Sequence, residues 1–181
     1  TVGTQIATTL GIDGPVLAGG IGGDVYLDPK LTQAQRAKAE AEALRIYRAH
    51  PQVEAVFTKT ELEKTPLPTG SPDKWTLIQR ARASFDAQRS GDFVVLLKKG
   101  VSLLSKPGKG DVATHGSPWD YDRRVPILFW RPGMAPQTRE EAVDTSNIMP
   151  TIAAMIGIPV DRSSIDGRCL AGIAGITCPS L

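Results

Sequence analysis

Apolar residues recur at helical spacing near the start of the chain. Between positions 2 and 10 every fourth residue is apolar, and a glycine follows. This spacing places the apolar side chains on one face of a helix, and glycine readily adopts the backbone conformation in which helices end. We therefore expect a helix whose apolar face carries Val2, Ile6 and Leu10 and which ends at Gly11.

A longer helix is predicted between Thr32 and His50. Thr32 is followed by Gln35, which is the capping-box pattern: the hydroxyl and the amide satisfy free backbone donors of the first turn. Pro51 disfavours helical backbone at His50, so the helix should end there. The segment is rich in alanine, and we expect one face to carry Ala37, Ala41, Leu44 and Tyr47.

Two shorter helices are expected, at 75–83 and 148–156. The second has Pro150 in its first turn, where no amide donor is needed, and Gly157 directly after it. Residues 58–72 contain three prolines and are expected to form a turn-rich connection.

Several segments have strand patterns. The unbroken apolar run at 93–97 is typical of a strand that is buried on both faces, and 125–130 is expected to be a second strand of this kind. The segment 53–58 partly alternates, and 15–17 and 24–27 are short candidates on either side of a glycine turn. Strands alternating with helices predict an α/β layered fold.

Composition and charge exclude several classes of protein. The 181 residues are 41% hydrophobic and 22% charged, as in a globular chain of about one domain. The net charge of +2 is too small to indicate nucleic-acid binding. The longest apolar runs have about six residues, whereas a membrane helix needs about 20. No signal peptide is visible at the start of the sequence.

Two cysteines and two histidines restrict the chemistry further. No CxxC or HExxH pattern is present, so no self-contained zinc site is recognised. Cys169 and Cys178 lie nine positions apart and either form a disulfide, in an oxidising compartment, or remain free thiols. The glycine-rich segments 18–24 and 105–111 match neither the GxGxxG nor the P-loop pattern and are interpreted as turns.

Two polar clusters each have a structural and a functional interpretation. Arg89 either binds an anion or lies in a tight turn before a strand. Asp120 and Asp122 either offer oxygens to a hard cation or pair with the adjacent Arg123 and Arg124. For both clusters we favour the structural interpretation.

The candidate functional residue is His115, in a loop reading Thr-His-Gly-Ser-Pro just before the apolar segment 125–130. A histidine held at the mouth of a strand has a setting suited to a metal ligand, while a hydrogen-bonded loop histidine is the simpler alternative. A serine hydrolase that uses Ser117 with His115 is disfavoured, because no nucleophile elbow and no triad order is present.

The His-Gly loop and the Val-Pro-hydrophobic segment after it resemble the last metal-ligand motif of the alkaline phosphatase superfamily. Further segments are similar to motifs of that family and occur in the same order. They read Gln-Val-Glu-Ala-Val-Phe-Thr at 52–58, Ser-Phe followed by Arg-Ser-Gly-Asp-Phe-Val-Val at 84–95, Asn-Ile-Met-Pro-Thr-Ile at 147–152 and Asp-Gly-Arg at 166–168. The spacing looks closest to the bacterial branch with a threonine nucleophile, which includes phosphate-irrepressible and Sphingomonas-type enzymes.

This resemblance implies a partial three-layer αβα sandwich and a zinc-dependent phosphatase acting on phosphate monoesters, with diesters as a second substrate class. In the family, two zinc ions clamp the phosphoryl group, and catalysis passes through a phospho-enzyme. The resemblance assigns one zinc ligand, His115, to this chain. The nucleophile and the remaining ligands would precede Thr1. No catalytic residue is therefore expected within the chain, which should be inactive alone.

The resemblance also implies an organisation and a setting. Residues 1–105 would form an inserted or peripheral α/β segment, and 106–181 would supply the metal-ligand loop, a core strand and a C-terminal helix. The expected partners are the missing N-terminal part of the same protein and a phosphate ester, with neither nucleic acid nor a membrane span, in the periplasm or outside the cell. The alternative is a non-catalytic α/β binding module that retains the phosphatase scaffold.

Overall fold

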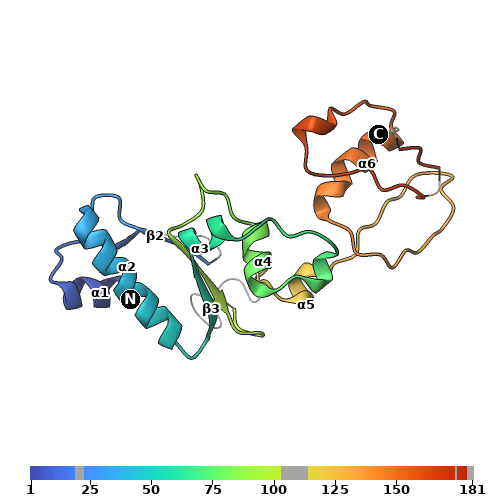
Figure 1. The fold of residues 1–181 in the computed structure, drawn as a ribbon. Helices are drawn as coiled ribbons and strands as arrows, with labels where there is room; N and C mark the ends of the chain where they lie inside the picture. The colour runs from blue at the N-terminus through green and yellow to red at the C-terminus, as the bar shows by residue number, and fades with distance from the viewer. Residues whose placement is uncertain (19–22, 103–113, 174, 179–181) are drawn as a thin grey trace. The chain divides into compact units, whose positions relative to one another are not determined.

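The structure, a computed structural model, divides the chain into two compact units (Figure 1). Unit 1 comprises Thr1–Pro68 and Trp75–Arg123, and unit 2 comprises Thr69–Lys74 and Arg124–Leu181. Along the sequence, the last segment of unit 1 therefore ends at Arg123. The predicted boundary after residue 105 falls outside the described residues and stays a prediction. The structure describes residues 1–18, 23–102, 114–173 and 175–178.

Unit 1 is built on a four-stranded sheet with the strand order β1-β2-β4-β3, in which all neighbours are antiparallel. The strands are β1 (Leu17–Ala18), β2 (Asp24–Leu27), β3 (Val53–Thr58) and β4 (Phe93–Leu97). The predicted strands of this unit are confirmed, with β1 displaced toward the C-terminus. The glycines at 19–22, in the turn predicted between β1 and β2, lie outside the described residues.

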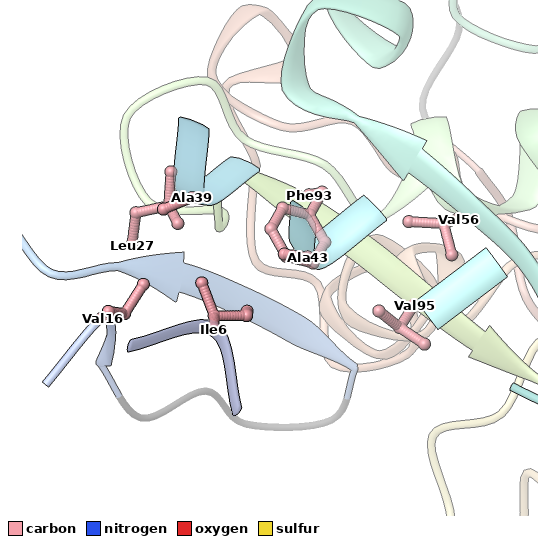
Figure 2. Close-up of a cluster of buried hydrophobic side chains, with 8 residues drawn as sticks. All are labelled: Ile6, Val16, Leu27, Ala39, Ala43, Val56, Phe93 and Val95. Carbon is pink, nitrogen blue, oxygen red and sulfur yellow. The ribbon is translucent and has the colours of Figure 1, made fainter. Parts of the chain in front are cut away.

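Helices cover both faces of this sheet. Unit 1 contains α1 (Val2–Leu10), α2 (Gln33–Ala49), α3 (Lys59–Lys64), α4 (Leu77–Ala83) and α5 (Asp120–Arg123). On one face, Phe93 and Val95 of β4 join a buried cluster to which α1 and α2 contribute (Figure 2). On the other face, Leu96 packs with Leu62 of α3 and Ala81 of α4. The predictions that this strand is buried on both faces and that the fold is a layered α/β fold are confirmed.

The buried face of α2 differs from the predicted one. Ala39 and Ala43 are fully buried, and the Tyr47 ring lies 5.7 Å from the Phe93 ring, between centroids. Ala37 and Ala41, expected on the buried face, are exposed. Because alanine occurs on several sides of this helix, the sequence alone does not single out a face, and the position of Phe93 decides it.

Two short helices were not predicted. α3 lies in the segment interpreted as turns, although Thr58 and Glu61 form a capping box in which the Glu61 carboxylate accepts from the Thr58 amide at 2.7 Å. α5 comprises Asp120–Arg123, for which the sequence predicted no helix. Both helices have six residues or fewer, which is too short for an apolar repeat to show.

Unit 2 has one α-helix among its described residues, α6 (Ile148–Met155), and the 3-10 turns η1 (Pro72–Lys74), η2 (Thr145–Asn147) and η3 (Arg162–Ser164). Cys169 and Cys178 form a disulfide, which decides the alternative left open by the sequence. Polar contacts also fix this unit: the Thr151 hydroxyl donates to the Asn147 carbonyl at 2.7 Å and accepts from the Leu170 amide at 3.0 Å.

The prediction of a buried strand at 125–130 is wrong for this chain. These residues lie in irregular backbone, and Leu128 and Trp130 are 88% and 77% exposed. The physical reason is the absence of a strand to pair with: among its described residues, unit 2 contains no β-strand.

No helix in the described ranges combines the length and the apolar character that a membrane crossing requires.

Candidate functional site

The loop that carries His115 is attached to the sheet of unit 1. The Trp119 indole Nε1 donates to the Leu97 carbonyl, at the end of β4, at 2.9 Å. One residue before Trp119, the Pro118 carbonyl accepts from the Arg80 guanidinium at 2.8 Å. These two hydrogen bonds hold the segment after His115 against β4 and α4, which both contribute side chains to the core.

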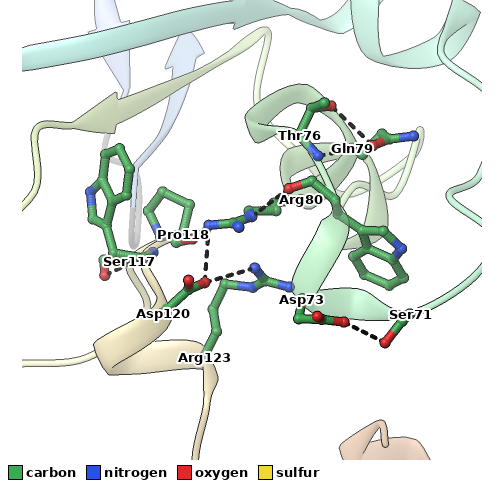
Figure 3. A network of polar contacts seen from close by, with 11 residues as sticks. Ser71, Asp73, Thr76, Gln79, Arg80, Ser117, Pro118, Asp120 and Arg123 are labelled. Carbon is green, nitrogen blue, oxygen red and sulfur yellow. Dashed lines mark hydrogen bonds and ion pairs between the residues drawn. The ribbon is translucent and has the colours of Figure 1, made fainter. Parts of the chain in front are cut away.

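Arg80 is the centre of this attachment (Figure 3). Its side chain is only 13% exposed, and its Nε donates to the Trp75 carbonyl at 2.8 Å while its Nη1 lies 3.3 Å from the Asp120 carboxylate. Arg123 approaches the same carboxylate at 3.5 Å and lies over the Trp75 ring. A guanidinium, with its fixed fork of donors, suits such a set of oxygens better than an ammonium group does.

Asp122 also holds the His115 loop, through a hydrogen bond to its backbone. Its Oδ2 accepts from the Ser117 amide at 2.6 Å. This hydrogen bond is the largest cause that lowers the pKa of the Asp122 carboxyl from its ordinary value, and the charge of His115 lowers it further. The predicted pairing with an adjacent arginine is confirmed for Asp120, which contacts Arg123 and also Arg80. Asp122 also has a structural contact, but to the backbone of the loop and not to an adjacent arginine.

His115 itself is exposed, so its imidazole is accessible to a ligand from outside the described residues. The neighbouring Gly116 has a φ of 98°, a conformation that side-chain-bearing residues rarely adopt, and this glycine permits the turn directly after the histidine. Among the hydrogen bonds of the described residues, none joins His115 to Ser117. The geometry thus gives no support to a serine hydrolase.

The described part of the chain does not assemble a complete metal site. It contains no group of three or more histidine, cysteine, aspartate or glutamate side chains that could hold a metal ion. The other histidine, His50, ends α2 and accepts from the Gln52 amide through Nδ1 at 3.2 Å. Among the described residues, His50 and His115 belong to no such group, so His115 stays the single candidate ligand that the sequence predicted.

The turn before β4 has a structural role. Arg89 is 85% exposed and lies 3.6 Å from Asp86, whose carboxylate accepts from the Gln88 and Arg89 amides. Its interpretation as a turn residue is confirmed. At the end of the same turn, the Asp92 carboxylate binds both the Leu27 amide and Arg36, a bridge that the sequence did not predict. The only signal for it was the Arg-Ser-Gly-Asp motif.

A similar structural role explains the Asp-Gly-Arg motif of unit 2. A Cβ atom on Gly167 would lie 2.0 Å from the Ser146 carbonyl oxygen, so only glycine fits there. The Arg168 amide donates to the Asn147 side-chain oxygen at 3.0 Å. The motif therefore fixes the segment before α6. The glycine and lysine loop at 105–111 lies outside the described residues.

The sequence is similar to curated alkaline phosphatases over nearly its whole length. It is 53% identical over 173 residues to alkaline phosphatase PhoK of a Sphingomonas species, which covers 94% of this chain and 31% of PhoK. It is 46% identical over 159 residues to alkaline phosphatase PhoD of Zymomonas mobilis, which covers 87% of this chain and 27% of PhoD. The chain thus spans less than a third of these relatives. No protein-family model matches it.

Solved structures show the same fold. A crystal structure of a mutant of alkaline phosphatase PafA superposes with a TM-score of 0.74 over 96% of this chain, at 21% sequence identity. Wild-type PafA superposes with a TM-score of 0.68 over 87% of the chain. The superpositions cover 32% and 29% of the PafA chains. The arrangement described above is therefore part of the alkaline phosphatase fold.

Proposed function

By sequence the chain belongs to the alkaline phosphatase superfamily, and from this premise we propose that it is the His115-bearing part of a zinc-dependent phosphatase. The observation that supports the proposal most strongly is the 53% identity to PhoK over 94% of the chain, a span that includes nearly every residue discussed here. The substrates proposed are phosphate monoesters, with diesters as the second class, and the proposed compartment is the periplasm or the exterior of the cell.

In this proposal His115 contributes one ligand to zinc. A neutral imidazole is a common zinc ligand, and the exposed ring of His115 leaves room for an ion and for further ligands. Zinc requires three or four protein ligands, so the remaining donors belong to the part of the protein outside this chain. Bound zinc would supply Lewis-acid chemistry at the phosphoryl group.

The residues of this chain would position that ligand. Arg80 and Trp119 hold the loop to the sheet, and Asp122 fixes the Ser117 amide two residues after His115. A ligand side chain on a loop that is already held by hydrogen bonds loses less conformational freedom when the ion binds. The nucleophile is proposed to lie in the remaining part of the protein, and the chain alone is proposed to be inactive.

The test is a chimera in which this chain replaces the region of Sphingomonas PhoK that it matches. We expect the chimera to bind zinc, measured by mass spectrometry of the metal, and to hydrolyse p-nitrophenyl phosphate, while the 181-residue chain does neither. His115→Ala should lower both zinc content and activity. Activity should fall by more than about 100-fold, because removing a metal ligand reduces activity more than removing a residue that only supports a ligand.

His50→Ala is the matched control, because His50 is also an exposed histidine, lies at the end of α2 and matches no ligand motif. It should leave zinc content and activity unchanged. Equal zinc content in the parent chimera and in His115→Ala would remove His115 from the metal site. A folded chimera that binds no zinc and hydrolyses no ester would instead support the non-catalytic binding module.

A further inference from the structure

The disulfide of unit 2 closes a loop that binds a second segment of the same unit. We call residues 169–178, between the two bonded cysteines, the cystine loop, and residues 131–139 the clamped segment. The clamped segment donates three side-chain hydrogen bonds to backbone carbonyls of the cystine loop. They run from Arg131 Nη2 to Gly175 at 2.7 Å, from Gln137 Nε2 to Gly172 at 3.1 Å and from Arg139 Nη1 to Ala171.

The clamped segment has few other described contacts. Arg131 and Met134 are half-buried, and the other residues of the segment are exposed. Among the described residues, its backbone forms one hydrogen bond to other backbone, from the Met134 amide to the Arg131 carbonyl at 3.2 Å. A segment with little apolar burial and few backbone hydrogen bonds opens easily. The contacts to the cystine loop are therefore the main attachment that keeps this segment in place.

The conformation of the cystine loop depends in turn on the disulfide. Gly172 and Gly175 have φ values of 81° and 73°, which glycine adopts readily. An added Cβ on Gly172 would lie 2.6 Å from Arg139 Nη1, so this glycine leaves the space that the guanidinium occupies. The same two glycines give the open loop many conformations, and closing a loop of about ten residues removes most of them. Reduction should therefore move the carbonyls out of reach of their donors.

We propose that the Cys169–Cys178 disulfide is a redox latch for the clamped segment. A dithiol opens the latch: its thiolate attacks one cysteine sulfur, the S–S bond breaks, and the second thiol of the reagent then resolves the mixed disulfide. The products are two cysteine thiols and the cyclic disulfide of the dithiol. Both cysteines are half-buried and lie outside the two core clusters, so this exchange does not require the core to open.

The latch would respond to the compartment that the protein occupies. Disulfides form in oxidising compartments, whereas cytosolic thiols are kept reduced. If the protein is exported, as proposed above, the clamped segment is free during synthesis and becomes fixed after export. The latch itself does not rest on the proposed function, because none of its residues is a proposed metal ligand or a catalytic residue.

Trypsin digestion measures the release of Arg139 directly. Trypsin cleaves after an arginine only when that side chain enters its S1 pocket. In the latched protein the Arg139 guanidinium is bound to the Ala171 carbonyl and to Glu141. In the PhoK chimera, cleavage of the 139–140 bond, followed by mass spectrometry, should be at least about 10-fold faster with dithiothreitol than without it. Removal of the reductant and reoxidation should restore the slow rate. Equal rates in both states would overturn the proposal.

Arg89 is the internal control in the same digest. Its side chain is 85% exposed and belongs to unit 1, which contains no cysteine. The 89–90 bond should therefore be cleaved at the same rate with and without reductant. If cleavage at both arginines accelerated equally, the disulfide would stabilise the chain as a whole, and the latch would be rejected.

A double substitution separates this disulfide from any other effect of the reductant. With Cys169→Ser and Cys178→Ser together, the 139–140 bond should be cleaved at the fast rate, and dithiothreitol should no longer change that rate. Slow cleavage in this variant would show that the clamped segment is held without the disulfide, which contradicts the proposal.

A matched pair of arginine substitutions tests the clamp in the oxidised protein. Arg131→Met removes one bond to the cystine loop and should speed cleavage after Arg139 by at least about 3-fold. Arg162→Met is the control, because Arg162 is an exposed arginine of the same unit whose side chain forms no hydrogen bond or ion pair to another described residue. It should leave the rate unchanged. Equal effects of the two substitutions would count against the clamp.

The outcomes for the latch and for the proposed function are distinguishable. Cleavage reports on the latch and hydrolysis of p-nitrophenyl phosphate reports on the function, so a chimera that shows the latch without activity rejects only the function. If the chimera does not fold, the same digests of the 181-residue chain, which contains every residue of the latch, decide between the outcomes.

Discussion

Arg36 and Asp92 lie 56 positions apart in the sequence and form an ion pair across unit 1, with Nη2 of the arginine 2.5 Å from Oδ1 of the aspartate. The second carboxylate oxygen, Oδ2, accepts from the Leu27 amide at 2.7 Å. One side chain thus joins α2 to the end of β2 and to the start of β4. The two side chains are 35% and 24% exposed, so the bridge is partly protected from water.

The substitution Asp92→Asn should destabilise the protein by about 1–3 kcal/mol, as for loss of hydrogen bonds to a charged group. The asparagine NH₂ group would face a donor, either the Leu27 amide or the Arg36 guanidinium. Asp86→Asn is the control, because the exposed Asp86 accepts its turn bonds through Oδ1, which an amide oxygen can replace. Urea unfolding of both variants measures the difference, and equal midpoints would contradict the bridge.

Gly91 should tolerate no larger residue. A Cβ atom there would lie 2.5 Å from the Val25 carbonyl oxygen and 2.8 Å from the Val25 nitrogen, and neither backbone atom can move without distorting β2. Gly91→Ala should therefore cost about 1–3 kcal/mol, as overpacking does. In α1, Gly3 has ordinary contacts of 3.5 Å to Leu17, so Gly3→Ala should stabilise the chain by about 0.5–1 kcal/mol. Urea unfolding of both variants measures these effects. If the unfolding midpoints of Gly91→Ala and Gly3→Ala shifted in the same direction, the expectation would be refuted.

The bond between Asp122 and Ser117 should make the His115 loop sensitive to acid. The pKa of the Asp122 carboxyl is lowered from the ordinary value of 3.8, first by the hydrogen bond from the Ser117 amide. Because the folded-state pKa is below the unfolded one, the stabilisation is fully present above the unfolded pKa. It is lost as the pH falls through the lower, folded pKa.

An NMR titration of the Ser117 amide proton measures this effect. Its chemical shift should follow the Asp122 carboxyl, with a midpoint below pH 3.8. In Asp122→Asn this titration step should disappear. A midpoint at or above the ordinary value would mean that the carboxylate does not hold the loop.

Reduction of the Cys169–Cys178 bond should destabilise unit 2 selectively. Closing a loop of about ten residues stabilises a fold by about 2.5–3 kcal/mol through the entropy of the unfolded chain. Unit 1 contains no cysteine and serves as an internal control. Hydrogen exchange with and without reductant should show faster exchange in α6 and unchanged exchange in β4. Acceleration of equal size in both would show that the disulfide does not act on unit 2 alone.

Helix ends were predictable where a capping or helix-terminating residue stands at that point in the sequence. The helices α1 and α2 begin and end near the residues that the sequence indicated, because capping boxes, Gly11 and Pro51 act on the backbone next to them. The burial of β4 on both faces was also predictable, since an unbroken apolar run is stable only when both sides are covered. The same sequence named His115 as the candidate ligand, and that assignment stays a prediction.

The roles of Arg80 and Asp92 could not be predicted, because each side chain contacts residues that are far away in the sequence. Arg80 reaches the Pro118 carbonyl, 38 positions away, and nothing near Arg80 in the sequence indicates that contact. Charged residues such as Arg80 and Asp92 are mostly exposed in folded proteins, so the sequence does not show which of them form bridges. Their role depends on which elements become neighbours.

By itself, the sequence determined approximately where α1, α2 and α6 begin and end, that β4 is buried on both faces, and which superfamily the motifs of the chain resemble. Capping, turn chemistry and apolar runs act over a few residues, and a superfamily is recognised from residues in order along the chain. Only the tertiary structure decided which face of α2 is buried, how Arg80 and Asp122 hold the His115 loop, and that 125–130 is exposed. Burial is a property of the neighbours that a segment finds, and an apolar run without neighbouring strands stays in water.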